Sequence, residues 1–308
     1  MRILVVGAGA TGGYFGGRLA EAGRDVTFLV RPARAARLRS TGLVIRSPHG
    51  DLGLDPKLAC ADQLLGEYDL VLLAVKAYSL DRTLTDLAPA VGPRTVILPL
   101  LNGMRHIPLL RQKYGSSTVL GGVCRVTTLL DEDGSVLQLN STQEIAYGTC
   151  GAAPAVAPAR VRAVDAALRG AGFTVRHSED ITQEMWEKWV HVAAVGAVTC
   201  LMRGVIGDVV ASPGGRDFAA RTLAECAAVA AACGRPVRAE SLKQSLAALT
   251  EPDSDTASSL YRDLLRGGPV EASHVLGDLI ERGDRRAVGM PLLRLAYTHL
   301  NVYQRSLG

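Results

Sequence analysis

The first half of the chain alternates short apolar runs with longer segments in which small and polar residues are mixed. The runs are rich in leucine and β-branched residues, as is typical of strands buried on both faces of a parallel sheet. Residues 12–23, between the first two runs, are mostly small and end on a glycine, which predicts a helix. This order of strand, helix and strand indicates a doubly wound α/β domain. The predicted strands span residues 3–6, 26–30, 70–75 and 95–100.

The pattern changes near residue 130. Asp133 and Gly134 form a turn-like pair between two apolar runs, which predicts antiparallel strands on either side. Residues 144–148 and 173–176 are further short segments of strand-like composition. We expect these strands to complete the first domain.

Strand-like patterns end at about residue 178, and helical periodicity follows. Ser178 or Asp180 can cap a helix whose apolar stripe includes Met185 and Val192. The rest of the chain carries further apolar repeats of helical spacing. Helices are predicted over residues 217–233, 239–249, 258–265, 270–282 and 292–304.

The length of 308 residues is about twice that of a usual single domain. We therefore expect two domains, an α/β domain over residues 1–178 and an all-helical domain over residues 179–308. The 34 basic and 30 acidic residues are interspersed and leave a formal charge of +4. Because there is no basic block to contact a phosphate backbone, nucleic acid is not an expected partner.

Cysteine usage and hydropathy indicate a cytoplasmic protein. The six cysteines show no CxxC spacing and no cluster with histidine, so we expect reduced thiols and no metal site. No apolar run reaches the roughly 20 residues that a membrane span needs. The first strand is also interrupted by glycines too soon to be a signal peptide.

Three glycines directly after the first predicted strand follow the pattern G-x-G-x-x-G. Gly7 permits a tight turn, Gly9 lets the backbone approach a pyrophosphate, and Gly12 lets the helix pack close to the strand. The alternative is a glycine-rich turn with no ligand. The position of the motif between a buried strand and a helix favours a dinucleotide-binding Rossmann domain.

The end of the second predicted strand favours NADPH over NADH. NAD-binding folds usually carry an acidic residue about 20 positions after the motif, to accept a hydrogen bond from the ribose 2′-hydroxyl. Here the sequence FLVRPAR has no acid and offers Arg31, with Arg34 close behind. A guanidinium suits a 2′-phosphate because it is always charged and donates in a planar fork. A solvated surface arginine is the alternative.

Lysine is scarce, so a lysine in apolar surroundings is a candidate for chemistry. Lys76 and Asn102 each follow a predicted strand at its carboxyl end, where ligands bind in open α/β sheets. Alternatively, both side chains bond to nearby loop carbonyls. Lys188 lies on the apolar stripe of its helix, where it either extends to solvent along its neighbours or faces a cleft.

Six short motifs occur in the order and spacing of one known family. They are GAGATGG, VKAYS, LNGM, EMWEKW, SSLYRDL and GGPVEASHVLG. With these motifs the chain resembles the ketopantoate reductases (2-dehydropantoate 2-reductases) over essentially its whole length. The resemblance implies an N-terminal NADP-binding Rossmann domain and a helical C-terminal substrate and dimerisation domain. It also implies an oxidoreductase that uses NADPH to reduce a 2-keto acid, as in the reduction of ketopantoate to pantoate in pantothenate biosynthesis.

The resemblance also implies roles for individual residues. A ketone that accepts a hydride develops negative charge on its oxygen, which an ammonium group can stabilise and protonate. Glu271 could instead be an ordinary acid near a helix N-terminus, favoured there by the helix dipole. By resemblance, Gly7, Gly9, Gly12 and Arg31 bind NADPH, Lys76 and Asn102 line the cofactor and substrate site, Lys188 is the proton donor, Ser259 binds substrate, and Glu271 is a catalytic acid near the nicotinamide.

The substrate side departs from the family pattern. The family usually has asparagine at the positions of Val192, Gly196 and Thr256. We therefore expect a more apolar and roomier pocket wall, and a 2-keto acid other than ketopantoate is a candidate substrate. The alternative is a protein that senses NADP(H) without turnover. A homodimer is compatible with these observations, which do not give the oligomeric state.

Overall fold

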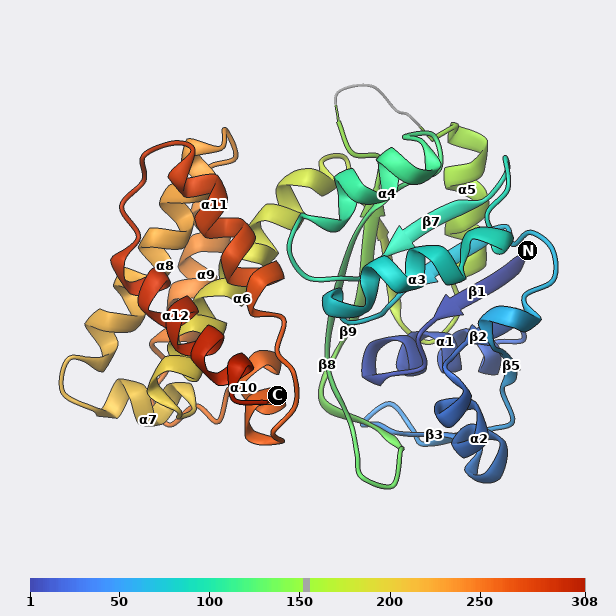
Figure 1. Cartoon of the computed structure of the whole chain (residues 1–308), viewed down its shortest axis with the longest axis horizontal. Helices are drawn as coiled ribbons and strands as arrows, with labels where there is room; N and C mark the ends of the chain where they lie inside the picture. Colours follow the sequence, from blue (N-terminus) through green and yellow to red (C-terminus); the bar gives the residue numbers. More distant parts are fainter. Residues whose placement is uncertain (152–155, 308) are drawn as a thin grey trace. The chain divides into compact units, whose positions relative to one another are not determined.

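The computed structural model describes residues 1–151 and 156–307 and divides into two compact units (Figure 1). The first unit comprises Met1–Leu101 and His106–Thr182, and the second comprises Asn102–Arg105 and Gln183–Gly308. The first unit contains every described strand of the chain, and the described secondary structure of the second is helical. The predicted fold class, an α/β domain followed by a helical domain, is confirmed.

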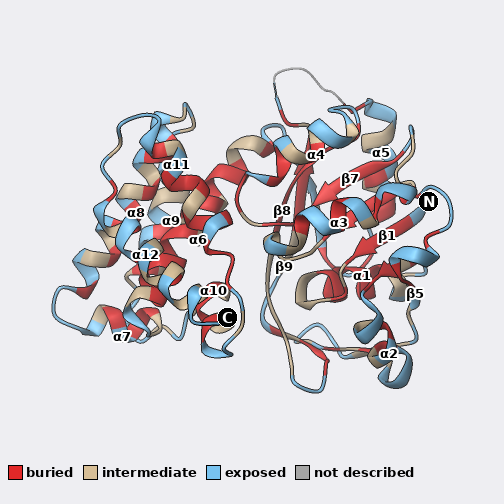
Figure 2. Cartoon of the chain, viewed as in Figure 1, coloured by how far each residue is buried: buried red, intermediate tan, exposed pale blue. Residues whose placement is uncertain are grey.

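The first unit is built on a five-stranded parallel sheet with the order β5-β2-β1-β6-β7. The four predicted strands are present, and three of them end one or two residues earlier than expected. Every residue of β6 and β7 is buried, as expected for a sheet covered on both faces, and β7 is coloured as buried in Figure 2. Because all pairs are parallel, their carboxyl ends meet at one edge. The strands are β1 (Arg2–Val6), β2 (Asp25–Leu29), β5 (Lys57–Ala59), β6 (Leu70–Leu73) and β7 (Val96–Pro99).

A second sheet has the order β10-β9-β3-β4, and β8 also pairs with β9. The predicted antiparallel pair is confirmed, because β8 and β9 pair in antiparallel orientation. In the turn that joins them, Gly134 has φ 82° and its amide donates to the carbonyl of Asp131. Residues 144–148 belong to the long strand β9 and are not a separate strand. The strands are β3 (Leu43–Arg46), β4 (Leu52–Leu54), β8 (Gly121–Leu130), β9 (Val136–Gly148) and β10 (Thr174–His177).

Helix α1 (Ala10–Glu21) packs against strands of both sheets. A Cβ atom on Gly16 would lie 2.5 Å from Cε1 of Phe28 in the parallel sheet. A Cβ atom on Gly17 would lie 2.6 Å from Cδ1 of Ile45 in the second sheet. A glycine in a helix costs about 1 kcal/mol relative to alanine, and here that cost is offset because the helix backbone can approach both sheets closely.

Further helices flank the two sheets of the first unit. Two of them, α2 and α5, begin with proline. The first amide of a helix has no partner within the helix, so the missing proton of proline costs nothing there. The helices are α2 (Pro32–Thr41), α3 (Leu80–Asp86), α4 (His106–Tyr114) and α5 (Pro158–Leu168).

The second unit is organised around helix α6 (Ile181–Met202). Most of its residues are buried, and Lys188, His191 and Val192 lie on a half-buried strip. The sequence predicted one apolar stripe, whereas the helix is buried on nearly all sides and includes the buried polar residues Glu184, Glu187 and Thr199. Among the described residues, no helix is long and apolar enough to span a membrane. The other elements are α7 (Ile206–Ala211), α8 (Gly215–Ala232), α9 (Ala239–Leu249), α10 (Ser259–Leu265), the π-helical turn η4 (Ser273–Gly277), α11 (Asp278–Asp284) and α12 (Pro291–Arg305).

Two helical glycines give a matched test of close packing. Gly16→Ala should lower the stability of the protein by about 1–3 kcal/mol, because the added methyl group overlaps Phe28 in a filled core. Gly196→Ala on α6 should raise stability by up to about 1 kcal/mol, because its methyl group would lie 3.5 Å from Leu260, at an ordinary contact distance. Thermal and urea unfolding of both variants measure the difference, and two variants of equal stability would contradict this account of α1.

Candidate functional site

The glycine-rich loop connects β1 to α1. Gly7 has φ 95°, and its amide donates to the carbonyl of Leu29 on β2 at 3.0 Å. A Cβ atom on Gly12 would lie 1.9 Å from the carbonyl oxygen of Gly7, so no other residue fits there. A Cβ atom on Gly9 would have no neighbouring atom within 4 Å, so the backbone there borders open space.

This loop has the features that a dinucleotide pyrophosphate requires. Gly9 is the N-cap residue of α1, and the first main-chain bond of the helix runs from the amide of Gly13 to the carbonyl of Gly9. The amide groups that precede it therefore point out of the helix N-terminus, where the helix dipole favours an anion. Because the bare backbone at Gly9 leaves that space open, the residues present fit a dinucleotide.

Arg31 and Ser79 lie together at the carboxyl edge of the parallel sheet. Arg31 is the exposed N-cap residue of α2, and its Nη2 donates to Oγ of Ser79 at 2.8 Å. Ser79 ends the short 3-10 turn η2 (Ala77–Ser79), which follows β6. The guanidinium and the hydroxyl are both hydrogen-bond donors that suit a phosphate. Sequence reasoning missed Ser79, although it ends the motif VKAYS.

Arg34 has a different environment. Its Nε donates to the carbonyl of Ala8 at 3.0 Å and its Nη2 to the carbonyl of Gly134 at 3.1 Å. Burial lowers the pKa of Arg34, and the charge of Arg37 lowers it further. Arg34 therefore fastens α2 to the glycine-rich loop and to the β8–β9 turn, whereas Arg31 is exposed.

The structure divides the sequence candidates between the two units. The first unit holds the three glycines and Arg31, together with the half-buried Lys76, which stands at the N-cap position of η2. Asn102 follows β7 along the chain, but the segment Asn102–Arg105 packs with the second unit. Four candidates therefore belong to the second unit, namely Asn102, Lys188, Ser259 and Glu271.

The half-buried face of α6 carries Lys188 and, one turn later, Val192. Gly196 follows after one more turn and is buried. A Cβ atom on Gly196 would lie 3.5 Å from Cδ2 of Leu260, a fully buried residue of α10. Leu260 therefore borders this part of α6, and the expectation of a roomier wall stays a prediction.

The start of α10 is tied to the same helix. Oγ of Ser258 accepts from the amide of Tyr261 at 3.0 Å and bonds to Oγ1 of Thr199 at 2.8 Å. Thr199 in turn donates to the carbonyl of Val195 at 2.7 Å, so its proton is used and Ser258 donates to it. The half-buried Ser259 is the first residue of α10 and is therefore held relative to α6. Sequence reasoning named Ser259 but missed Thr199, which has no local motif.

Glu271 lies just before η4 and is only 6% exposed. Its carbonyl accepts from the amide of Val275 at 2.9 Å, and the indole Nε1 of Trp189 on α6 donates to the carbonyl of Val275 at 2.8 Å. Glu271 is thus buried just before a helical segment, and both its catalytic role and its interpretation as an acid favoured by the helix dipole stay predictions. Thr256 is exposed, and its carbonyl accepts from the amide of Ile206.

Two further contacts fix the rotation of α6 about its axis. Glu187 is buried and accepts from Nε and Nη2 of Arg238 at 2.7 and 2.6 Å. Burial acts to raise the pKa of Glu187, but the hydrogen bonds from Arg238 and Gln183 outweigh it and hold that pKa below its usual value. His191 bonds to Ser245 on α9 at 3.2 Å, and burial together with the charge of Lys188 lowers its pKa.

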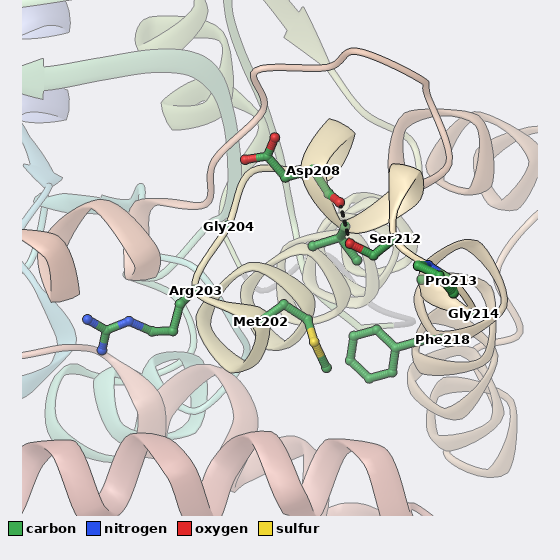
Figure 3. A pocket seen from close by; sticks show the side chains of 10 residues that line it. Met202, Arg203, Gly204, Asp208, Ser212, Pro213, Gly214 and Phe218 are labelled. Carbon is green, nitrogen blue, oxygen red and sulfur yellow. Dashed lines mark hydrogen bonds between the residues drawn. The ribbon is translucent and has the colours of Figure 1, made fainter.

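A cavity of about 430 Å³ lies at the far end of α6 (Figure 3). Met202, the last residue of α6, is 14 residues beyond Lys188, which is about 21 Å along a helix. The cavity is therefore separate from the Lys188 face. Among the described residues, no group of three or more histidine, cysteine or acidic side chains could hold a metal ion. The lining residues are Met202, Arg203, Gly204, Asp208, Val209, Ser212, Pro213, Gly214, Gly215 and Phe218.

Comparison with known proteins identifies relatives along the whole chain. The chain is 35% identical to "Uncharacterized oxidoreductase YkpB" of Bacillus subtilis over 99% of both chains. It is 27% identical to the 2-dehydropantoate 2-reductase of Halobacterium salinarum, also over 99% of both. A solved structure of D-mandelate dehydrogenase with NADH and anilino(oxo)acetate superposes with a TM-score of 0.89, covering 100% of this chain and 99% of that one. Its identity is 20%, so this likeness shows the fold alone.

Two family models match consecutive parts of the chain. The model described as "Ketopantoate reductase PanE/ApbA" matches residues 3–151. The model described as "Ketopantoate reductase PanE/ApbA C terminal" matches residues 180–304. Together they cover most of the first unit and most of the second, so the chain belongs to the ketopantoate reductase family of oxidoreductases.

Proposed function

We propose that the protein is an NADPH-dependent reductase of a 2-keto acid whose tail carries fewer hydroxyl groups than ketopantoate. The observation that carries the proposal is the set of contacts that ties the proposed active residues to α6. Lys188 lies on that helix. Ser259 is the residue after Ser258, whose side chain bonds to Thr199 on α6. Glu271 precedes the turn that Trp189 anchors. Family membership supports the reaction class, and the glycine-rich loop supports the cofactor.

The cofactor would be held by the first unit. The N-terminus of α1 and the open backbone at Gly9 suit the pyrophosphate, and the pair Arg31 and Ser79 suits a 2′-phosphate. Lys76, at the carboxyl edge of the sheet, is a further proposed contact from this unit, and Asn102 of the second unit is proposed to contact both the cofactor and the substrate. The bound cofactor supplies the hydride that reduces the carbonyl carbon.

The second unit would supply the proton. As the carbonyl carbon is reduced, negative charge develops on the oxygen, and the ammonium of Lys188 stabilises it and donates a proton to give the alcohol. The carboxylate of Glu271 orients the Lys188 ammonium or the nicotinamide end of the cofactor. Ser259 and Asn102 hydrogen-bond to the keto acid and hold it in place.

Substrate choice would follow from the apolar side chain of Val192 on the half-buried face of α6. Val192 offers only apolar contact, and Leu260 borders Gly196 at an ordinary contact distance. A polar tail buried against this face would lose its hydrogen bonds to water without replacement. We therefore propose a branched or aromatic 2-keto acid as the better substrate.

The proposed function is tested by the oxidation of NADPH with a panel of 2-keto acids, followed by absorbance. Turnover of at least one of them is expected. A protein that binds NADPH and reduces none of them would instead be a cofactor sensor.

Cofactor choice gives a prediction for Arg31. Arg31→Ala should weaken NADPH binding by about tenfold to a hundredfold and leave NADH binding nearly unchanged, because only NADPH has the 2′-phosphate. Ser79→Ala should weaken NADPH binding by a smaller factor. Arg39→Ala is the matched control, because Arg39 is an exposed arginine about 12 Å further along the same helix. Fluorescence titration measures both affinities, and equal losses for the two cofactors would contradict the assignment.

Proton donation gives a prediction for Lys188. Lys188→Ala should lower kcat by at least about a hundredfold, the usual scale for a proton-transfer group, with little change in NADPH affinity. Lys243→Ala, an exposed lysine on α9, is the control and should keep normal turnover. Steady-state kinetics on the best keto acid measures both variants. Near-normal turnover by Lys188→Ala at neutral pH would remove Lys188 from the chemistry.

Substrate choice gives a prediction for the α6 wall. Val192→Asn should raise kcat/KM for ketopantoate relative to branched and aromatic 2-keto acids, because the new amide can hydrogen-bond to a hydroxylated tail. Gly196→Asn should not give this gain, because Leu260 stands in the way of its side chain. The proposal on substrate is wrong if ketopantoate is already the best substrate of the unmodified protein and Val192→Asn changes nothing.

A further inference from the structure

His274 is a buried histidine that has no role in the proposed mechanism. It lies in the π-helical turn η4 and is 8% exposed. The next residue, Val275, accepts the indole hydrogen bond from Trp189, so the turn is anchored to α6. Single π-helical turns are rare and are frequent at functional sites.

The segment Asn102–Arg105 packs directly on His274. Gly103 has φ 77°, and a Cβ atom there would lie 3.2 Å from both Cδ2 and the carbonyl oxygen of His274. The imidazole is hydrogen-bonded to the main chain of Asn102. These contacts explain why the segment belongs to the second unit, although the residues on both sides of it belong to the first.

The charges around His274 favour a neutral imidazole. Burial lowers its pKa, and the positive charge of Arg105 acts in the same direction. The carboxylates of Glu271 and Asp278 and the bond to Asn102 raise it, but the pKa stays below its usual value. Nε of Arg282 is 3.2 Å from the Asp278 carboxylate and partly neutralises that charge. A neutral imidazole keeps one N–H group, which can donate to the carbonyl of Asn102.

We propose that His274 is a positioning residue that fixes the side-chain amide of Asn102 for the reaction. The imidazole holds the Asn102 main chain by a hydrogen bond and supports the adjacent backbone at Gly103, so the amide has one orientation relative to Glu271 and Lys188. This inference rests on the proposed function, in which Asn102 contacts the cofactor and the keto acid. His274 acts only through Asn102.

A double-mutant cycle tests the link between the two residues. His274→Leu, which removes the donor, should lower kcat/KM for the best keto acid by about tenfold, the scale of one hydrogen bond, mainly by raising KM. In the Asn102→Ala background the same change should cost less than about twofold, because no amide remains to be oriented. A second tenfold loss in that background would overturn the proposal.

Two conservative variants test whether the hydrogen bond carries the effect. His274→Asn and His274→Gln each place an N–H donor near one of the two ring nitrogens. At least one of them should recover most of the lost kcat/KM. If neither does, the hydrogen bond is not the link and the proposal fails.

Hydrogen exchange supplies a readout that does not depend on activity. In His274→Leu the amides of residues 102–105 should exchange about tenfold faster than in the unmodified protein, with exchange in α6 unchanged. His191→Leu is the matched control, because His191 is another partly buried histidine of the second unit that bonds to Ser245 instead. Unchanged exchange at 102–105 would overturn the proposal. If no keto acid is reduced but this exchange rises, the proposed function fails while the support of Asn102 by His274 stands.

Discussion

The close approach of α1 to its surroundings is the constraint on which the first unit depends. A Cβ atom on Gly12 would stand 1.9 Å from the carbonyl of Gly7, and Gly16 and Gly17 bring the same helix against two different sheets. With a larger residue at any of these positions, the helix would have to move away from the sheets. Its N-terminus would then no longer lie beside the carboxyl edge of the parallel sheet, where a pyrophosphate can bind.

In the second unit the corresponding constraint is the enclosure of α6. A helix surrounded by other elements cannot rotate, because Trp189, Glu187 and Thr199 each bond to a different partner. The bonds of Trp189 and Thr199 hold the segments that carry Glu271 and Ser259, and the bond of Glu187 holds the start of α9. The partial burial of Lys188 therefore depends on how all of these elements pack around α6. A lysine on an isolated helix would be exposed.

Glycine also permits close packing in the second unit. At Gly196 the missing side chain lets Leu260 approach α6, and at Gly103 it lets the main chain rest on His274. An alanine at residue 196 still fits, because its methyl group would lie 3.5 Å from Leu260, at an ordinary contact distance.

The sequence by itself determined the four buried parallel strands, the glycine-rich loop and most helices of the second unit. These features have local signals, since apolar runs, helical periodicity and glycine spacing are visible within a few residues. The three-residue strands β4 and β5 and the short helix α7 are too brief to show such a pattern. Only the tertiary structure brought Ser79 to Arg31, Leu260 to Gly196, and Asn102 into the second unit. Each of these pairings joins segments far apart in the chain, and no local preference of either segment encodes its partner.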